Sequence, residues 1–195
     1  MSDDFDALLE ESVRIHGHLC PGQVLGVRLS MLGLNSIGIT DPKNTQRKDF
    51  IVYVEIDRCA TDAIQSVTGA SLGKRSLKFM DYGKMAATFV NLKTGHAVRI
   101  VAREDSRLKS TEYFPDETDT HKAQLQAYMI MKNEELFDLT DVVVSIAPED
   151  MPGRPLKRLQ CHLCGEFVQD MRHIEKDGKA VCKACFHNNA YYKKL

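Results

Sequence analysis

The sequence contains no apolar run long enough to span a membrane, no internal repeat and no low-complexity tract. Its start is acidic where a secretory signal would be basic, so we expect neither a signal peptide nor a membrane anchor. We therefore expect a cytoplasmic protein, in which thiols stay reduced. The six cysteines of such a protein indicate metal ligands or reactive thiols before they indicate disulfides.

No charge of one sign dominates the chain, because its net charge is −1. The composition, 43% apolar and 27% charged residues, is that of an ordinary soluble globular protein. From Leu156 onward the net charge is +4, so the first 155 residues carry −5. This split, with prolines and a glycine over 148–155, predicts two domains, 1–150 and 156–195. It is too mild to favour nucleic acid as a partner.

Hydrophobic periodicity predicts an α+β core domain with a mostly antiparallel sheet packed with helices. The expected helices are 3–15, 21–34, 60–68 and 116–137, and the expected strands are 50–57, 77–82, 85–92, 97–103 and 142–147, with a turn at 93–96.

The second expected helix is apolar nearly all round and should be buried. Its small residues Gly22, Gly26 and Ser30 form a stripe, which predicts close packing against a helix of the same or another subunit.

Two C-x2-C pairs stand near the end of the chain, Cys161 with Cys164 and Cys182 with Cys185, separated by 17 residues. This spacing is typical of a structural zinc site, in which four thiolates close a tetrahedral shell. A redox dithiol pair and accidental spacing are the alternatives.

The surroundings of these pairs predict a small treble-clef or zinc-ribbon-like domain. Gly165 allows a tight turn after the first pair, and residues 176–179 form a natural hairpin tip. The second pair should open a helix from Cys182 to about Tyr192. The three nearby histidines are expected to be ordinary surface residues: His162, His173 and His187.

A second constellation stands near the start of the chain and comprises His16, His18, Cys20 and Cys59. Cys20 precedes Pro21 and should begin a helix, where backbone N–H groups lower the pKa of a thiol. Cys59 follows a strand and begins another helix. If the two segments meet, they offer nitrogen and sulfur ligands to Zn²⁺ or another soft transition metal, with a position left for water or substrate. Alternatively, His16 is a core histidine and Cys59 a small buried hydrophobe.

Several uncommon motifs then follow one another in a set order over residues 5–147. They are His16-Gly-His-Leu-Cys-Pro-Gly22, Glu55-Ile-Asp-Arg-Cys-Ala-Thr-Asp-Ala-Ile-Gln65, Thr68-Gly69, Leu72-Gly-Lys74 and Asp81-Tyr-Gly-Lys84. In these motifs the chain resembles the FmdE family of formylmethanofuran dehydrogenase subunits, some members of which also carry a C-terminal four-cysteine finger.

This resemblance implies an α+β core, a homodimer and a cavity lined by the histidine–cysteine loop. It also implies a methanogenesis-related role in one-carbon metabolism of formyl groups or CO2, beside molybdenum or tungsten pterin-dependent oxidoreductase subunits. It implies candidate catalytic or metal-binding roles for His16, His18, Cys20 and Cys59.

The resemblance extends to further motif positions with less defined roles, namely Asp62, Lys74, Asp81, Tyr82 and Lys84. A lysine there would bind a carboxylate or phosphate and Tyr82 would donate a hydrogen bond; alternatively the lysines face solvent and residues 81–84 form only a turn. Two positions depart from the family. Ala70 stands where many members have cysteine, and Arg75 where glycine is common.

Three functions follow from these observations. The first is an enzyme, or an accessory subunit related to formylmethanofuran dehydrogenase, that acts on a small-molecule substrate at the core metal. The second is a non-catalytic metal or sulfur handler that serves assembly of a pterin-dependent enzyme through exposed, low-pKa thiols. In the third, the zinc finger docks to protein or nucleic acid and the core is a scaffold.

Overall fold

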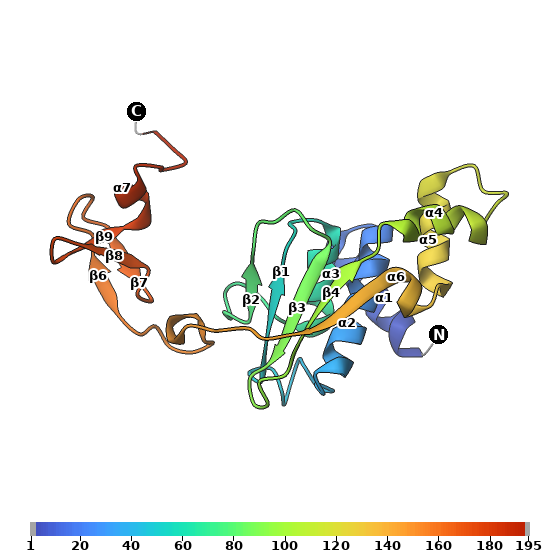
Figure 1. Cartoon of the computed structure of the whole chain (residues 1–195), viewed down its shortest axis with the longest axis horizontal. Coiled ribbons are helices and arrows are strands. Elements are labelled where there is room, and N and C mark those ends of the chain that lie inside the picture. Colours follow the sequence, from blue (N-terminus) through green and yellow to red (C-terminus); the bar gives the residue numbers. More distant parts are fainter. Residues whose placement is uncertain (1–2, 194–195) are drawn as a thin grey trace. The chain divides into compact units, whose positions relative to one another are not determined.

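The computed structural model describes residues 3–193, and its chain divides into two compact units at the Ser145–Ile146 bond. The first unit is an α+β domain, as predicted (Figure 1). No helix within residues 3–193 combines the length and apolar character that crossing a membrane requires. The first unit contains α1 Asp3–His16, α2 Pro21–Ser36, β1 Phe50–Val54, α3 Cys59–Thr68, β2 Leu77–Phe79, β3 Ala86–Asn91, β4 Ala97–Ala102, α4 Asp105–Tyr113, α5 Thr120–Ile130, α6 Asn133–Leu136 and β5 Phe137–Val142.

The first unit is built on a five-stranded sheet in the order β2-β1-β3-β4-β5. Only β1 and β2 pair in parallel, and every other neighbouring pair is antiparallel, which confirms a mostly antiparallel sheet. The turn between β3 and β4 lies where it was predicted, with Gly95 in the left-handed region at φ 76°.

Helices α1, α2 and α3 cover one face of this sheet (Figure 1). The central helix α2 packs against α1, α3, β3 and β4. The side chains between the layers are apolar and almost inaccessible to water, so their burial supplies the main stabilisation of this unit. From the strands these are Phe50, Val52, Val54, Leu77, Ala87, Phe89, Val98, Ile100 and Phe137.

The stripe of small residues on α2 lets α3 of the same chain approach closely. A Cβ atom added at Gly26 would lie 2.6 Å from both the Ala60 carbonyl oxygen and the Ala63 Cβ atom. One turn earlier, a Cβ atom at Gly22 would lie 3.0 Å from the Cβ atom of Cys59. Ser30 keeps its hydroxyl within α2 by donating to the Gly26 carbonyl. The predicted close packing is therefore confirmed, with α3 as the partner.

The segment from 105 to 147 differs from the prediction. Helix α4 was missed because it has almost no hydrophobic periodicity. The expected helix 116–137 is two helices, α5 and α6, and α5 begins after Asp119, whose carboxylate accepts from the backbone N–H groups of His121 and Lys122. The expected strand 142–147 is also wrong, because residues 137–142 form β5 and Val143 is 99% exposed. Its β-branched run is typical of a buried strand, but pairing with β4 fixes an earlier register.

Strand β5 lies at one end of the sheet and is exposed over most of its length. Two of its carboxylates pair with side chains that reach across from the neighbouring segment. Asp138 accepts a hydrogen bond from Arg103 at 2.8 Å, and Asp141 lies 2.9 Å from the Nε2 atom of His96. This edge of the sheet therefore carries one ion pair, Asp138 with Arg103, and one carboxylate–imidazole hydrogen bond, Asp141 with His96.

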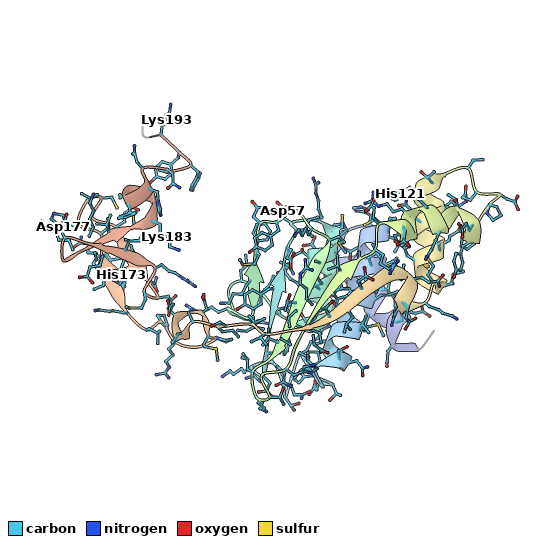
Figure 2. All side chains as sticks on the ribbon, viewed as in Figure 1. Asp57, His121, His173, Asp177, Lys183 and Lys193 are labelled. Atoms are coloured by element: carbon cyan, nitrogen blue, oxygen red, sulfur yellow. The ribbon has the colours of Figure 1, made fainter. Side chains whose placement is uncertain are left out.

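The second unit consists of two short hairpins and a helix. The tip of the second hairpin is the predicted one, with Asp177 and Gly178 at φ 51° and 71°, as a two-residue turn requires (Figure 2). The final helix is shorter than predicted, because Asn188 adopts a left-handed conformation and ends it. The elements are η1 Pro148–Asp150, β6 Arg158–Gln160, β7 Phe167–Gln169, β8 His173–Lys176, β9 Lys179–Cys182 and α7 Lys183–His187.

Candidate metal centres

The four cysteines of the second unit form one cluster. Their sulfur atoms all lie within 4.8 Å of one another: Cys161, Cys164, Cys182 and Cys185. The first pair lies in the turn between β6 and β7, and the second spans the end of β9 and helix α7. Four sulfur ligands and no other side chain at the centre match a closed structural site. The cluster can therefore hold a metal ion such as Zn²⁺.

The backbone around this cluster directs N–H groups at sulfur. The N–H of Cys182 donates to the Cys161 sulfur at 3.3 Å, and the N–H of Cys185 donates to the Cys182 sulfur at 3.4 Å. Backbone N–H groups of Cys164 and Cys182 lower the pKa of the Cys161 thiol to about 6. The neighbouring Cys182 thiol and burial raise the pKa of Cys185 to about 12. Backbone N–H groups thus favour the thiolate form of Cys161.

The second unit has little apolar core of its own. Among its described residues, only Cys161 and Val181 are buried. So small a buried area cannot offset the conformational entropy of some forty ordered residues. A metal ion bound at this cluster would supply the missing free energy.

A second cluster forms in the first unit from His16, Cys20 and Cys59. One ring nitrogen of His16 and the two sulfur atoms all lie within 4.8 Å of one another. His16 ends α1, Cys20 precedes α2 and Cys59 begins α3. The close approach of α2 to α3 at Gly22 brings the two cysteines together. Packing of small residues therefore assembles this cluster from positions far apart in the sequence.

The imidazole of His16 is held from one side only. Its Nδ1 atom lies 2.8 Å from the Oδ2 atom of Asp62, one turn into α3. Its Nε2 atom is buried and has no hydrogen-bond partner. A carboxylate on one ring nitrogen and a free lone pair on the other is the arrangement that metal-binding histidines use. Asp62, a motif position of undefined role in the sequence, thus orients this ring.

A buried polar network supports the cluster from beneath. Gln23, fully buried on α2, donates from its amide nitrogen to the Cys59 carbonyl oxygen at 2.5 Å. Its amide oxygen accepts from the hydroxyl of Ser12 on α1. One glutamine therefore ties the three helices together at the cluster. Sequence reasoning missed Gln23, although an isolated amide three residues after Cys20 in an apolar helix is a usable signal.

The histidine–cysteine loop differs from the expectation in the pKa of Cys20. His18 is exposed and packs its ring against His16, 4.6 Å between centroids, but does not belong to the three-residue cluster. Burial raises the pKa of the Cys20 thiol, and Cys59 adds to this, although N–H groups of Gln23 and Gly22 act in the opposite direction. The predicted lowering of this pKa is wrong, because Cys20 is only 6% exposed.

The remaining motif residues are exposed and do not belong to the three-residue cluster. Lys74 donates to the Gly69 carbonyl at 2.8 Å, beyond the end of α3. Residues 81–84 follow β2, and Lys84 lies 5.9 Å from the ring centroid of Tyr82. The N–H of Lys84 donates to the Glu55 carbonyl at 3.1 Å, which fastens this turn to the chain just after β1. Asp81, Tyr82 and Lys84 therefore lie at the sheet edge from which the Cys59 segment leaves.

Both departures from the family motifs have a structural setting. Ala70 is buried and borders a small cavity that Asp62 and Ser66 also line. It offers no ligand, so the cluster consists of three residues. Arg75 has φ 62°, in the left-handed region, which explains in physical terms why glycine suits this position.

Comparison with known proteins finds similarity to a curated protein and to solved structures. A protein of Archaeoglobus fulgidus named "Probable S-adenosyl-L-methionine-binding protein" is 29% identical over 201 residues, covering 91% of this chain and 52% of the relative. The chain thus spans about half the length of that relative. The crystal structure of a tungsten formylmethanofuran dehydrogenase FmdE-like protein from Syntrophus aciditrophicus matches with a TM-score of 0.62 and 16% identity, covering 96% of this chain and 95% of that one. At this identity the likeness demonstrates a shared fold.

The sequence model of one family also matches, over residues 15–138, and is described as "FmdE, Molybdenum formylmethanofuran dehydrogenase operon". The matched segment contains the whole three-residue cluster and Asp62. It also contains the five strands of the sheet except the last residues of β5. The match covers well over half of the chain, and the chain belongs to the FmdE family.

Proposed function

We propose that the first unit is a metal-dependent enzyme core in which His16, Cys20 and Cys59 hold one soft transition metal ion such as Zn²⁺. Two observations carry this proposal: the Nε2 atom of His16 is buried without a hydrogen-bond partner, and one ring nitrogen of His16 lies within 4.8 Å of two thiols. Buried polar atoms without partners are rare in folded proteins. A metal ion would satisfy this one.

The surroundings of His16 suit a metal-binding histidine better than a histidine that only fills the core. A core histidine would need hydrogen bonds at both ring nitrogens, whereas His16 has one, to Asp62. Cys20 and Cys59 bring sulfur, which favours soft or borderline cations. Asp62 keeps the Nδ1 proton in place and so leaves Nε2 free to bind. Gln23 fixes the backbone of Cys59.

Three protein ligands leave one coordination position open. A metal ion held in this way polarises a substrate oxygen or lowers the pKa of a bound water molecule. We propose a small formyl or carboxyl group as the substrate, carried on a larger molecule, in one-carbon metabolism. The choice of substrate rests on the family resemblance. Two further proposals have the same basis: a functional link to molybdenum or tungsten pterin-dependent oxidoreductases, and a homodimeric state.

The turn at residues 81–84 is the candidate for binding the rest of the substrate. It is fastened to the segment between β1 and Cys59 through the Lys84 N–H group. Lys84 and Tyr82 are exposed there and offer a cation and a phenol hydroxyl. An anionic carrier would suit this edge. Lys74 has a weaker claim, because its ammonium group is already bonded to the Gly69 carbonyl.

Two alternatives receive less support. A sulfur handler needs an exposed thiol of low pKa, whereas Cys20 is buried and its pKa is raised. Binding of S-adenosyl-L-methionine is a second candidate that rests on the Archaeoglobus relative, which aligns with 91% of this chain. Equilibrium dialysis with labelled S-adenosyl-L-methionine tests it directly.

Metal content tests the main proposal. The full chain, purified without added metal, should contain two metal ions. Cys20→Ser and Cys59→Ser should each lose one of them, and Cys161→Ser should lose the other. His18→Gln is the matched control, because it alters the same loop outside the cluster. One ion in the wild type, lost only from Cys161→Ser, would remove the metal-dependent function.

Cobalt substitution tests the open position. Formate added to the Co²⁺-loaded chain should change the visible ligand-field bands of the core ion, since the four-sulfur site has no position for it. Cys20→Ser should abolish the change while the bands of the finger remain. Absence of a formate response in the wild type would argue for a closed, non-catalytic core site.

A further inference from the structure

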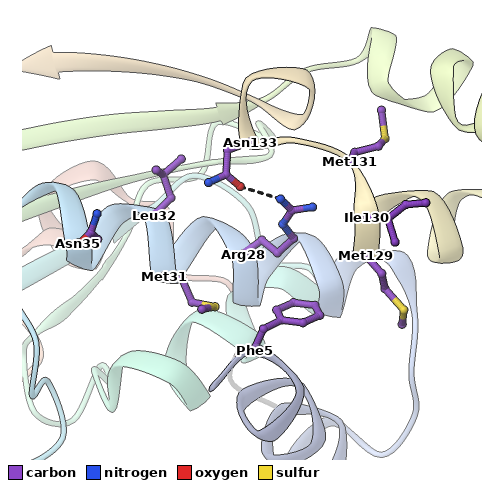
Figure 3. A pocket seen from close by; sticks show the side chains of 9 residues that line it. All are labelled: Phe5, Arg28, Met31, Leu32, Asn35, Met129, Ile130, Met131 and Asn133. Carbon is purple, nitrogen blue, oxygen red and sulfur yellow. Dashed lines mark hydrogen bonds between the residues drawn. The ribbon is translucent and has the colours of Figure 1, made fainter. Parts of the chain in front are cut away.

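A separate cavity of about 670 Å³ lies at the other end of α1 from His16 (Figure 3). Phe5 from the first turn of α1 borders it, and eleven residues of helix, about 16 Å, separate Phe5 from His16. The remaining walls come from α2 and from the segment that joins α5 to α6. The cavity is therefore distinct from the candidate metal centre.

The walls of this cavity combine apolar side chains with polar groups, and polar atoms form about half of the accessible wall. Its apolar residues are Phe5, Met31, Leu32, Met129, Ile130 and Met131. The polar residues are Arg28, Asn35 and Asn133. A hollow of this size, in which polar groups converge beside apolar side chains, can accommodate a small molecule that has both a polar and an apolar part. Methionine side chains adapt readily to the shape of what they contact.

Arg28 is the one charged residue of helix α2 and lies near its middle. Its guanidinium donates to the Tyr128 carbonyl at 2.7 Å and to the Asn133 Oδ1 atom at 2.8 Å (Figure 3). Both acceptors are neutral, and no carboxylate among the described side chains forms an ion pair with it. Burial lowers the pKa of Arg28. The negative charge of Glu134 acts in the opposite direction. The charge remains, because arginine stays protonated.

The bonds to α5 explain only part of this arrangement. By donating to the Tyr128 carbonyl, Arg28 caps the end of α5, where carbonyl groups lack helical partners. A guanidinium has five N–H donors, so three are left after these two bonds. Asn133 accepts through Oδ1 and keeps its amide N–H groups to donate. The polar groups of the cavity thus offer donors and positive charge.

We propose that this cavity binds a small organic anion, a carboxylate joined to an apolar or aromatic body, with the carboxylate at Arg28 and Asn133 and the body against the methionines. A planar carboxylate pairs with the two-pronged edge of a guanidinium through parallel hydrogen bonds. An anion there would neutralise a half-buried charge that has no ion-pair partner in the described chain. Phe5, Met31 and Met129 offer ring and thioether contacts to an aromatic body.

Calorimetric titration of the full chain with 3-phenylpropionate tests this proposal, with 3-phenylpropanol as the uncharged control. The acid should bind at least about tenfold more tightly than the alcohol, because only the acid forms the charged pair. Arg28→Lys should weaken binding of the acid by about tenfold and leave the affinity for the alcohol unchanged. Arg47→Lys, at an exposed arginine outside the cavity, is the matched control and should change neither.

Two further variants keep the test decisive. Met31→Trp fills the cavity while Arg28 stays in place, so it should abolish binding of the acid in a chain that still unfolds cooperatively. Cys20→Ser should leave binding unchanged, which separates this cavity from the candidate metal centre. Equal affinity for acid and alcohol, or unchanged binding in Met31→Trp, would overturn the proposal. If the acid did not bind and the chain formed a concentration-dependent dimer that Met31→Trp disrupts, the cavity would be a contact site for a second copy of the chain instead.

Discussion

The Nδ1 atom of His16 and the Oδ2 atom of Asp62 lie 2.8 Å apart, although 46 positions separate the two residues in the sequence. This pairing leads to the first prediction. Asp62→Ala should weaken metal binding at the core centre by about 10- to 100-fold, because the carboxylate orients the imidazole and raises its basicity. Competition with a chromophoric chelator measures this, with the four-sulfur site of the same chain as internal reference.

The matched control for Asp62→Ala is Asp57→Ala. Asp57 is exposed in the loop after β1 (Figure 2) and does not belong to the three-residue cluster. If both variants released the core metal equally, or neither did, the hydrogen bond to His16 would have no part in metal binding.

Gly26→Ala should destabilise the first unit by about 1–3 kcal/mol or more, because the added Cβ atom collides with the backbone of α3. The nearest atom would be the Ala60 carbonyl oxygen at 2.6 Å. Urea denaturation followed by circular dichroism measures the free energy of unfolding. Gly73→Ala is the control, since its added Cβ atom meets nothing within 4 Å. We also expect Gly26→Ala to lose core metal, because α2 and α3 carry Cys20 and Cys59.

Gln23→Leu should cost about 1–3 kcal/mol of unfolding free energy, since it strands the Ser12 hydroxyl and the Cys59 carbonyl inside the protein. Thermal or urea unfolding of the metal-free chain measures this. Adding Ser12→Ala to Gln23→Leu should cost less than the sum of the single variants, because each single change leaves the other partner unsatisfied. Simple additivity would mean that the three groups do not form one network.

Removal of metal should unfold the second unit and leave the first one folded. Metal binding in such fingers contributes about 10–16 kcal/mol of apparent free energy, far more than the buried Cys161 and Val181 can supply. NMR amide dispersion before and after chelation measures the change for each unit. Cys161→Ser should reproduce the effect, whereas His162→Gln should not. A second unit that stayed folded without metal would contradict the folding role.

The carboxyl group of Asp41 should titrate with a pKa of about 2, held down by the Thr45 N–H and hydroxyl and by the Asn44 amide. The fold therefore favours the carboxylate. Its contribution to stability is present above the ordinary pKa of 3.8 and is lost as the pH falls through about 2. Carbon-13 NMR of the Asp41 carboxyl measures the midpoint, which should rise toward 3.8 in Thr45→Val. A midpoint near 3.8 in the wild type would contradict the hydrogen bonds.

Local patterns in the sequence predicted much of this structure. The glycine stripe, the hairpin at Asp177 and the paired cysteines each depend on neighbours close in sequence, so their spacing carries the geometry. The prediction was wrong for the segment from α4 to β5, where local patterns carry little information. Its helices show little hydrophobic periodicity, and pairing with β4 sets the register of β5.

The core centre was predictable only in part. Residue types identified His16, Cys20 and Cys59, but their meeting depends on how closely α2 packs on α3. The role of Asp62 depends on the direction in which one side chain leaves α3, and that of Gln23 on two partners in other helices. No spacing rule along a single chain encodes contacts of this kind. His18 was named from its motif and lies outside the cluster, because the loop turns it toward solvent.

The paired carboxylates of β5 have a consequence for how molecules of this protein meet in solution. An outermost strand with free N–H and C=O groups is a template on which a strand of another molecule can add. Asp138 and Asp141, held by Arg103 and His96, place charged and polar side chains along that strand, and such side chains hinder the addition of another strand. Neutralising both carboxylates would therefore favour aggregation of an otherwise well-folded protein.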